Sequence, residues 1–233
     1  RELDGARLFI TGGTGFFGRW LVDSALHARE ALGVDLSITL LSRAPDAALA
    51  RQPHWAGQPG LAWVEGDVRS FVHPAGSFSH IIHAATDTSP DRQADSLDLL
   101  DTIVGGTRHV LDLAARCGAH RVLYASSGAV YGRSRGQPPL AEEMPLAPDS
   151  LDPAASYGIG KRYAEHLGLL LARARGIGFV TARCFAFVGP GLPLDGHFAI
   201  GNFIRDALEA PSIVLKGDGT PLRSYLYGAD LAA

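Results

Sequence analysis

LFITGGTGFFG stands at residues 8–18 and joins an apolar run of strand length to a glycine-rich turn and an apolar helical pattern. Gly12 can adopt the positive φ that a tight strand-to-helix turn requires. Gly15 has no Cβ, so another group can approach the backbone closely, and Gly18 lets the helix pack against the strand. The first N–H groups of the helix lie at its positive end, so this turn predicts an anion site.

The same alternation of strands and helices continues along the chain. Near-continuous apolar strands separated by helices are typical of a parallel sheet that is covered on both faces. We predict strands at 7–11, 36–41, 61–65, 79–84, 121–125 and 178–183, and helices at 16–31, 96–117 and 156–175. The predicted fold is therefore α/β, a doubly wound parallel (Rossmann) sheet.

The last fifty residues follow a weaker pattern. After a loop rich in Gly and Pro, the sequence predicts a helix at 198–209, a strand at 212–215 and an extended piece at 223–227. We therefore divide the chain into a Rossmann domain at 1–185 and a small C-terminal lobe at 186–233.

The composition excludes several classes of protein. A chain of 233 residues with 46% apolar residues can bury one large core. The net charge of −3 and the scattered positive residues argue against nucleic-acid binding, and no apolar run is long enough to span a bilayer. Cys117 and Cys184 fit no metal-ligand spacing, so we expect neither a metal site nor a disulfide. We expect a cytoplasmic protein without nucleic-acid or membrane partners.

In its βαβ context, the glycine turn predicts the pyrophosphate site of a nicotinamide dinucleotide; the alternative is a glycine-rich turn of an unrelated α/β protein. NAD-binding proteins usually carry an acid at the end of the second strand, where this chain has Ser42 and Arg43. A guanidinium can hold a 2′-phosphate bidentately, which favours NADP over NAD. Alternatively, Arg43 stacks on adenine or lies in solvent. Asp67, after the third strand, is placed to accept from the adenine amino group, or is a plain turn residue.

A second motif, YGIGK at residues 157–161, puts a phenol and an ammonium on one helix face. A free tyrosine has a pKa near 10, and we expect Lys161 to lower the pKa of Tyr157 by charge attraction. Ser127 follows the fifth strand, at the edge where α/β sheets bind ligands. It is placed to bond the substrate oxygen that Tyr157 protonates or deprotonates; a helix-capping role is the alternative.

These motifs occur in the order seen in extended short-chain dehydrogenases/reductases, and the chain resembles the NAD-dependent epimerase/dehydratase family from about residue 7 to 233. The resemblance implies a nucleotide-sugar substrate, with Ser127, Tyr157 and Lys161 as the catalytic group. The family continues beyond the position of residue 233, so we expect the substrate lobe to be incomplete. The expected cofactor-binding residues are Gly12, Thr14, Gly15, Phe16, Phe17, Gly18, Ser42, Arg43, Asp67, Val68, His83, Ala84, Ala85, Tyr157 and Lys161.

Several positions depart from the family pattern. The acidic pair of the family's 4,6-dehydratases is replaced by Gly128 and Ala129, which cannot do acid/base work, so that activity is disfavoured. The family's phosphate-contacting Asn is replaced by Ala186. The remaining candidates for holding the substrate are Asn202 and Arg223, which we expect at the pyrophosphate, and His197, either a proton donor in epimerisation or a solvated loop residue.

The expected function is that of an NAD(P)-dependent epimerase or ketoreductase acting on a nucleotide-activated sugar. One alternative is a reductase of a non-nucleotide carbonyl compound. An alternative of another class is a non-catalytic NAD(P)-binding regulatory protein, against which the complete Ser/Tyr/Lys group argues. Relatives commonly dimerise through the helices that match 96–117 and 156–175, so we expect a homodimer.

Overall fold

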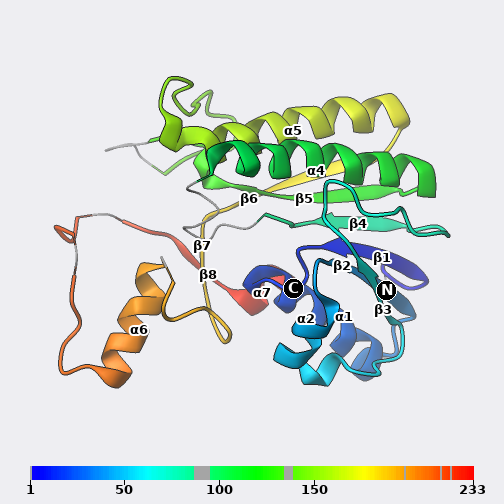
Figure 1. Ribbon diagram of the computed structural model, residues 1–233, viewed down its shortest axis with the longest axis horizontal. Helices are drawn as coiled ribbons and strands as arrows, with labels where there is room; N and C mark the ends of the chain where they lie inside the picture. Colours follow the sequence, from blue (N-terminus) through cyan, green and yellow to red (C-terminus); the bar gives the residue numbers. More distant parts are fainter. Residues whose placement is uncertain (1, 87–94, 134–138, 197, 216, 221) are drawn as a thin grey trace.

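The computed structural model describes residues 2–86, 95–133, 139–196, 198–215, 217–220 and 222–233. Its centre is a six-stranded sheet with the strand order β3-β2-β1-β4-β5-β6, in which every neighbouring pair is parallel (Figure 1). This confirms the predicted fold class. The strands are β1 (Ala6–Thr11), β2 (Leu36–Ser42), β3 (Leu61–Glu65), β4 (His80–His83), β5 (Arg121–Ser127) and β6 (Gly178–Cys184).

Helices cover both faces of the sheet. On one face lie α1 (Phe16–Leu32) and the short α2 (Pro45–Arg51), which the sequence pattern did not predict (Figure 1). On the other face α4 (Ser96–Cys117) and α5 (Ser156–Arg175) pack side by side. Alternate residues of each strand point to opposite faces, so the sheet separates two apolar cores.

The strand order reverses between β1 and β4. The chain moves outward from β1 through β2 to β3 and then returns to pair β4 on the other side of β1. At such a reversal the connections after the two strands diverge and leave a crevice outside their carboxyl ends. The fold therefore places a ligand crevice next to the glycine turn.

The C-terminal part contains α6 (Ala199–Glu209), α7 (Gly228–Ala232) and a parallel pair formed by β7 (Ala186–Val188) and β8 (Tyr225–Tyr227). The predicted strand at 212–215 is wrong: residues 212–215 are exposed, and no strand in the described part of the chain pairs with them. β-propensity alone does not form a strand. α7 packs against α1, and the division of the chain after residue 185 stays a prediction.

None of the helices in the described part of the chain combines the length and hydropathy that a membrane span requires.

Candidate active site

A cavity of about 770 Å³ opens at the carboxyl edge of the sheet. Its walls come from the glycine turn, the ends of β2 to β6, the first turns of α4 and α5, and the loop after β7. A cavity of this volume suits a ligand of cofactor size. The predicted residues that line it are Gly12, Thr14, Gly15, Phe16, Phe17, Ser42, Arg43, Asp67, Val68, Ala84, Ala85, Ser127, Tyr157 and Lys161.

Other predicted site residues are not part of this lining. Gly18 lies one turn into α1, and His83 is buried below the cavity wall. The amide oxygen of Asn202 accepts from Arg205, and Arg223 is exposed in the C-terminal part. His197 lies outside the described residues.

The glycine turn has the geometry that the sequence predicts. Gly12 has a φ of +73°, and a Cβ there would lie 2.5 Å from the carbonyl oxygen of Ala84. A Cβ on Gly18 would collide with the carbonyl oxygen of Gly12, so this glycine allows α1 to pack on the turn. Within the described residues, a Cβ on Gly15 would have that same oxygen as its one neighbour, at 3.5 Å. The turn therefore offers exposed backbone and the start of a helix, which fits a dinucleotide pyrophosphate.

His83 connects the ends of β1 and β4 with α4. Its Nδ1 lies 2.7 Å from the hydroxyl of Thr11, and its Nε2 lies 3.0 Å from the hydroxyl of Thr107. Thr107 donates its own proton to the carbonyl of Ile103, so the network assigns the imidazole proton to Nε2. Thr11 also accepts from the N–H of Ala85. Burial lowers the pKa of His83 to about 3, so the ring is neutral. Because it is buried, the ring supports the cavity wall rather than lining the cavity.

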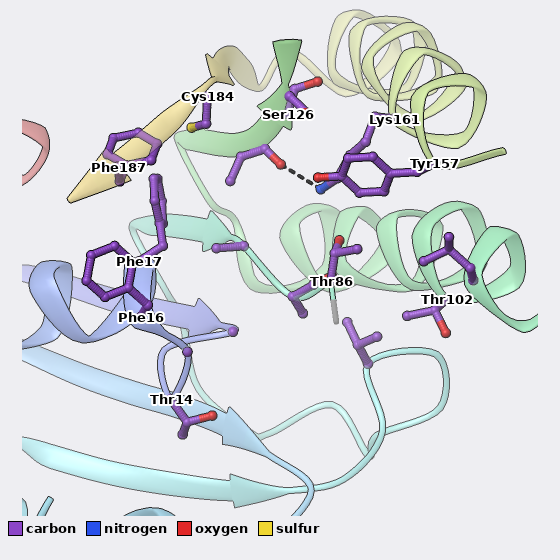
Figure 2. Close-up of a pocket in the computed structure, with 18 of the residues that line it drawn as sticks. Thr14, Phe16, Phe17, Thr86, Thr102, Ser126, Tyr157, Lys161, Cys184 and Phe187 are labelled. Atoms are coloured by element: carbon purple, nitrogen blue, oxygen red, sulfur yellow. Dashed lines mark hydrogen bonds between the residues drawn. The ribbon is translucent and has the colours of Figure 1, made fainter. Parts of the chain in front are cut away.

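Ser127, Tyr157 and Lys161 meet at one end of the cavity. Tyr157 and Lys161 project from α5 into the cavity (Figure 2). Ser127 ends β5 and also lines the cavity. The Ser127 hydroxyl accepts from the N–H of Ala129 and caps a short 3₁₀ turn at 128–131, as the capping alternative expected. A hydroxyl keeps its own proton for a second bond, and the nearby Ser127 lowers the pKa of the Tyr157 phenol.

The pKa of Tyr157 differs from the sequence expectation. Burial raises the pKa of the phenol, and the hydrogen bond with Ser127 lowers it only in part. The ammonium of Lys161 lies 5.9 Å from the centre of the Tyr157 ring and donates instead to the carbonyl of Ala125, at 2.7 Å. The expected lowering by Lys161 is therefore absent, and the phenol is protonated at neutral pH.

Lys161 is almost completely buried, with 3% of its surface exposed. Its ammonium also lies 4.9 Å from the centre of the Tyr124 ring. Burial lowers the pKa of Lys161 to about 7, while Cys184 and Glu165 act in the opposite direction. The side chain is thus held next to the cavity, where burial disfavours its charged form.

A polar network behind Ser127, Tyr157 and Lys161 was not predicted from the sequence. Ser126 donates to Glu165 at 2.5 Å, and Glu165 forms a two-point ion pair with Arg183. Arg183 also donates to the hydroxyl of Tyr131. Glu165 follows Lys161 by one helical turn, and this spacing was the one sequence signal for its position. The network ties α5 to β5 and β6 beside the site.

The described residues include no group of three His, Cys, Asp or Glu side chains that could hold a metal ion.

Comparison with known proteins agrees with this geometry. A model of the NAD dependent epimerase/dehydratase family matches residues 8–233. UDP-glucuronic acid decarboxylase 1 of Xenopus tropicalis is 32% identical over 99% of this chain and 52% of that protein. UDP-glucuronic acid decarboxylase 6 of Arabidopsis thaliana is 31% identical over 97% of this chain and 63% of that protein. The chain thus spans about half to two thirds of the length of these relatives.

Solved structures share the fold. The dTDP-glucose 4,6-dehydratase DesIV of Streptomyces venezuelae, solved with NAD and TYD bound, is 27% identical with a TM-score of 0.78, over 97% of this chain and 69% of that one. UDP-glucuronic acid 4-epimerase of Bacillus cereus, in complex with UDP-glucuronic acid and NAD, has a TM-score of 0.77 at 21% identity, over 97% and 70%. With its glycine turn, its Ser/Tyr/Lys group and a match to the family along almost its whole length, the chain belongs to the NAD dependent epimerase/dehydratase family.

Proposed function

We propose that this protein is an NAD(P)-dependent epimerase or ketoreductase that acts on a nucleotide-activated sugar. The observation that carries the proposal is that Tyr157, Ser127 and Lys161 line the same cavity as Gly12 and Gly15. One cavity thus joins a proton-transfer group to a turn suited to a dinucleotide. The bound nicotinamide would supply the hydride acceptor or donor.

In the proposed mechanism, the chain's own residues move the proton. Tyr157 stands as a neutral phenol, ready to give its proton to the oxygen of a keto-sugar. Ser127 orients that oxygen by a hydrogen bond, and the Ala125 carbonyl holds Lys161 one helical turn from the phenol. In the oxidative direction Tyr157 first releases its proton to solvent, and Ser127 stabilises the phenolate that results. This phenolate then takes the proton from the sugar hydroxyl.

For the cofactor we propose NADP over NAD, because Ser42 ends β2 and Arg43 follows it, at the place where an acid would bind a ribose hydroxyl. The DesIV and Bacillus cereus structures contain NAD. They support binding of a nicotinamide dinucleotide by this chain, but not a preference for NADP. Titration of the protein with both dinucleotides would decide between them.

For the substrate, the names of the relatives support a nucleotide sugar. Asn202 and Arg223 remain our candidates for its pyrophosphate, and His197 for a proton donor. A 4,6-dehydratase reaction stays disfavoured, because the Phe185 ring occupies the place into which a side chain at Gly128 would extend.

A second candidate is decarboxylation of a nucleotide-linked uronic acid, which the names of the curated relatives favour. Oxidation at C4 of such a sugar creates a β-keto acid, and this can lose CO₂ without a further acidic side chain. Release of CO₂ from UDP-glucuronic acid would separate this reaction from epimerisation or reduction.

The test of the proposal is Tyr157→Phe. General acid–base help is worth roughly 10²–10⁴-fold in rate, so this variant should lose at least about a hundredfold in turnover. Its affinity for the dinucleotide should stay close to that of the wild type, because the phenol acts on the substrate. Turnover with a panel of nucleotide sugars and dinucleotide titration measure the two effects.

Equal turnover in wild type and Tyr157→Phe would contradict the mechanism. Dinucleotide binding without turnover of any sugar would favour the non-catalytic regulatory protein, and turnover of only non-nucleotide carbonyl compounds would favour the other reductase.

A further inference from the structure

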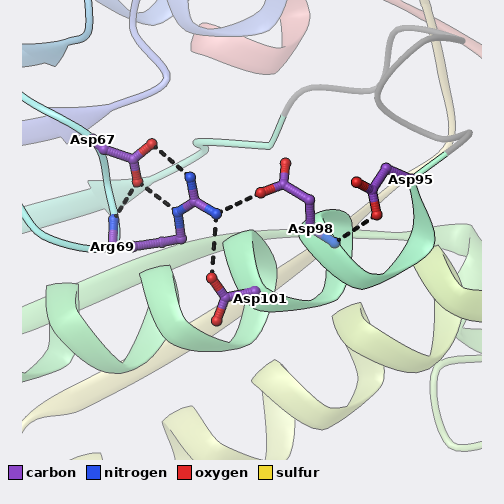
Figure 3. Close-up of polar contacts among 5 residues, drawn as sticks. All are labelled: Asp67, Arg69, Asp95, Asp98 and Asp101. Carbon is purple, nitrogen blue, oxygen red and sulfur yellow. Dashed lines mark hydrogen bonds and ion pairs between the residues drawn. The ribbon is translucent and has the colours of Figure 1, made fainter.

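Arg69 forms a clasp between two walls of the cavity. Its Nε and Nη2 donate to the two carboxylate oxygens of Asp67, at 2.8 and 3.1 Å. Its Nη1 donates to Asp98 at 2.6 Å and to Asp101 at 3.2 Å, both on α4 (Figure 3). The α4 end is itself capped by Asp95, which accepts from the N–H of Asp98. The guanidinium therefore locks the segment after β3 to the first turns of α4.

The clasp lies at the end of the cavity away from the catalytic group. Asp67 and Arg69 follow β3, at one edge of the sheet, and Tyr157 reaches the cavity from the opposite side, beyond β5. With the pyrophosphate at the glycine turn and the nicotinamide beside Tyr157, the purine half of the dinucleotide must extend toward β2 and β3. The clasp therefore borders the purine end.

The hydrogen bonds to Arg69 leave part of the acceptor capacity of the Asp67 carboxylate unused. A carboxylate has about four acceptor directions. In Asp67, one oxygen accepts from both the N–H and the Nε of Arg69, and the other accepts from Nη2. Among the described residues, no donor takes the last acceptor direction, which lies on the second oxygen. The guanidinium also lowers the pKa of Asp67, so the group stays an anion that can only accept.

We propose that Arg69 is the positioning residue for base selection: it orients the Asp67 carboxylate so that its single remaining acceptor direction selects a purine with an exocyclic amino group. Adenine presents a donor at that position, whereas hypoxanthine presents a carbonyl oxygen, which an ionised carboxylate repels. This inference rests on the proposed dinucleotide binding and deepens it.

The experiment compares two pairs of probes: NAD with nicotinamide hypoxanthine dinucleotide, and NADP with its hypoxanthine analogue. Calorimetric titration gives the ratio of dissociation constants within each pair. We expect the wild type to prefer adenine by about tenfold or more, since a lost charge-assisted hydrogen bond costs roughly 1.5–3 kcal/mol. Arg69→Ala should lose most of this preference. Arg69→Lys should keep part of it, because a lysine bonds one carboxylate oxygen at a time.

Asp101→Asn is the matched control. Asp101 is the most exposed partner of Arg69 and does not contact Asp67, so its loss should leave the base preference unchanged. Thermal unfolding of each variant reports on folding separately from the ratio. If Arg69→Ala does not fold, the ratio in Arg69→Lys decides.

An unchanged adenine preference in the folded Arg69 variants would overturn the inference, as would a wild type that binds both bases equally. If the wild type binds none of the four dinucleotides, the proposed function itself fails.

Discussion

Lys161 has the most perturbed environment among the residues that line the cavity. A lysine that is buried beside two aromatic rings loses its hydration, and one hydrogen bond to the Ala125 carbonyl replaces only part of it. The free-energy cost of removing this charge from water arises only in the folded state. The same burial that places the ammonium next to Tyr157 therefore reduces the stability of the protein wherever the ammonium stays charged.

This cost predicts how stability depends on pH. The pKa of Lys161 is about 7 in the folded protein and 10.5 in its model compound, so above pH 7 the unfolded chain binds more protons. The free energy of unfolding should therefore rise with pH, by up to about 1.4 kcal/mol per unit. The rise should end near pH 9. The pKa of Cys184 is raised from 9.0 to about 11, so above pH 9 its titration lowers the free energy of unfolding.

Urea unfolding at pH 7, 8 and 9 measures this rise, which should reach about 2–3 kcal/mol at most. Lys161→Met should remove it. A flat profile in the wild type, or the same slope in the variant, would contradict the assignment.

At the scale of elements, the glycine turn and α1 act as one unit with two separable roles. A Cβ on Gly18 collides with backbone, and a Cβ on Gly15 meets only one atom at an ordinary contact distance. Gly15 also has a φ of −80°, which alanine adopts freely. Gly18 therefore serves the packing of α1, and Gly15 is free to serve a ligand.

We therefore expect two alanine substitutions to change different properties, one the stability and the other the dinucleotide affinity. Gly18→Ala should lower the free energy of unfolding by about 1–3 kcal/mol through overpacking. Gly15→Ala should change it by less than about 1 kcal/mol but weaken dinucleotide binding at least about tenfold, because its Cβ would stand where the backbone approaches the pyrophosphate. Thermal unfolding and dinucleotide titration of both variants check this, and wild-type affinity in Gly15→Ala would refute the pyrophosphate assignment.

At the scale of the whole molecule, the outer face of α5 carries apolar side chains. Tyr163 and Leu170 are half exposed there, and they lie seven residues apart, on one face of the helix. We propose that this face forms the homodimer expected for the family, together with α4.

Sedimentation velocity should then show a dimer, and Leu170→Glu should raise its dissociation constant by roughly tenfold or more, because a buried carboxylate in an apolar interface is costly. Leu32→Glu, at the exposed end of α1, is the matched control and should leave the dimer intact. A monomeric wild type would contradict the proposal.

Much of this molecule follows from local sequence. The helices at Ser96–Cys117 and Ser156–Arg175 begin and end as predicted, each followed by a glycine in the left-handed conformation. The six sheet strands also appear where predicted, to within two residues at each end. Where the pattern failed, at 212–215, the missing element was a partner strand, which no local pattern can supply.

By itself, the sequence determined the doubly wound sheet and the glycine turn, because periodicity and glycine geometry are local properties of a chain. Helical spacing also singled out Tyr157 and Lys161 as candidates, whose catalytic role stays a prediction. Only the tertiary structure decided that His83 supports the cavity wall, that Lys161 binds the Ala125 carbonyl rather than acidifying Tyr157, and that Arg69 joins Asp67 to α4. These outcomes depend on burial and on hydrogen bonds between residues 24 to 72 positions apart, which packing creates and spacing along the chain does not encode.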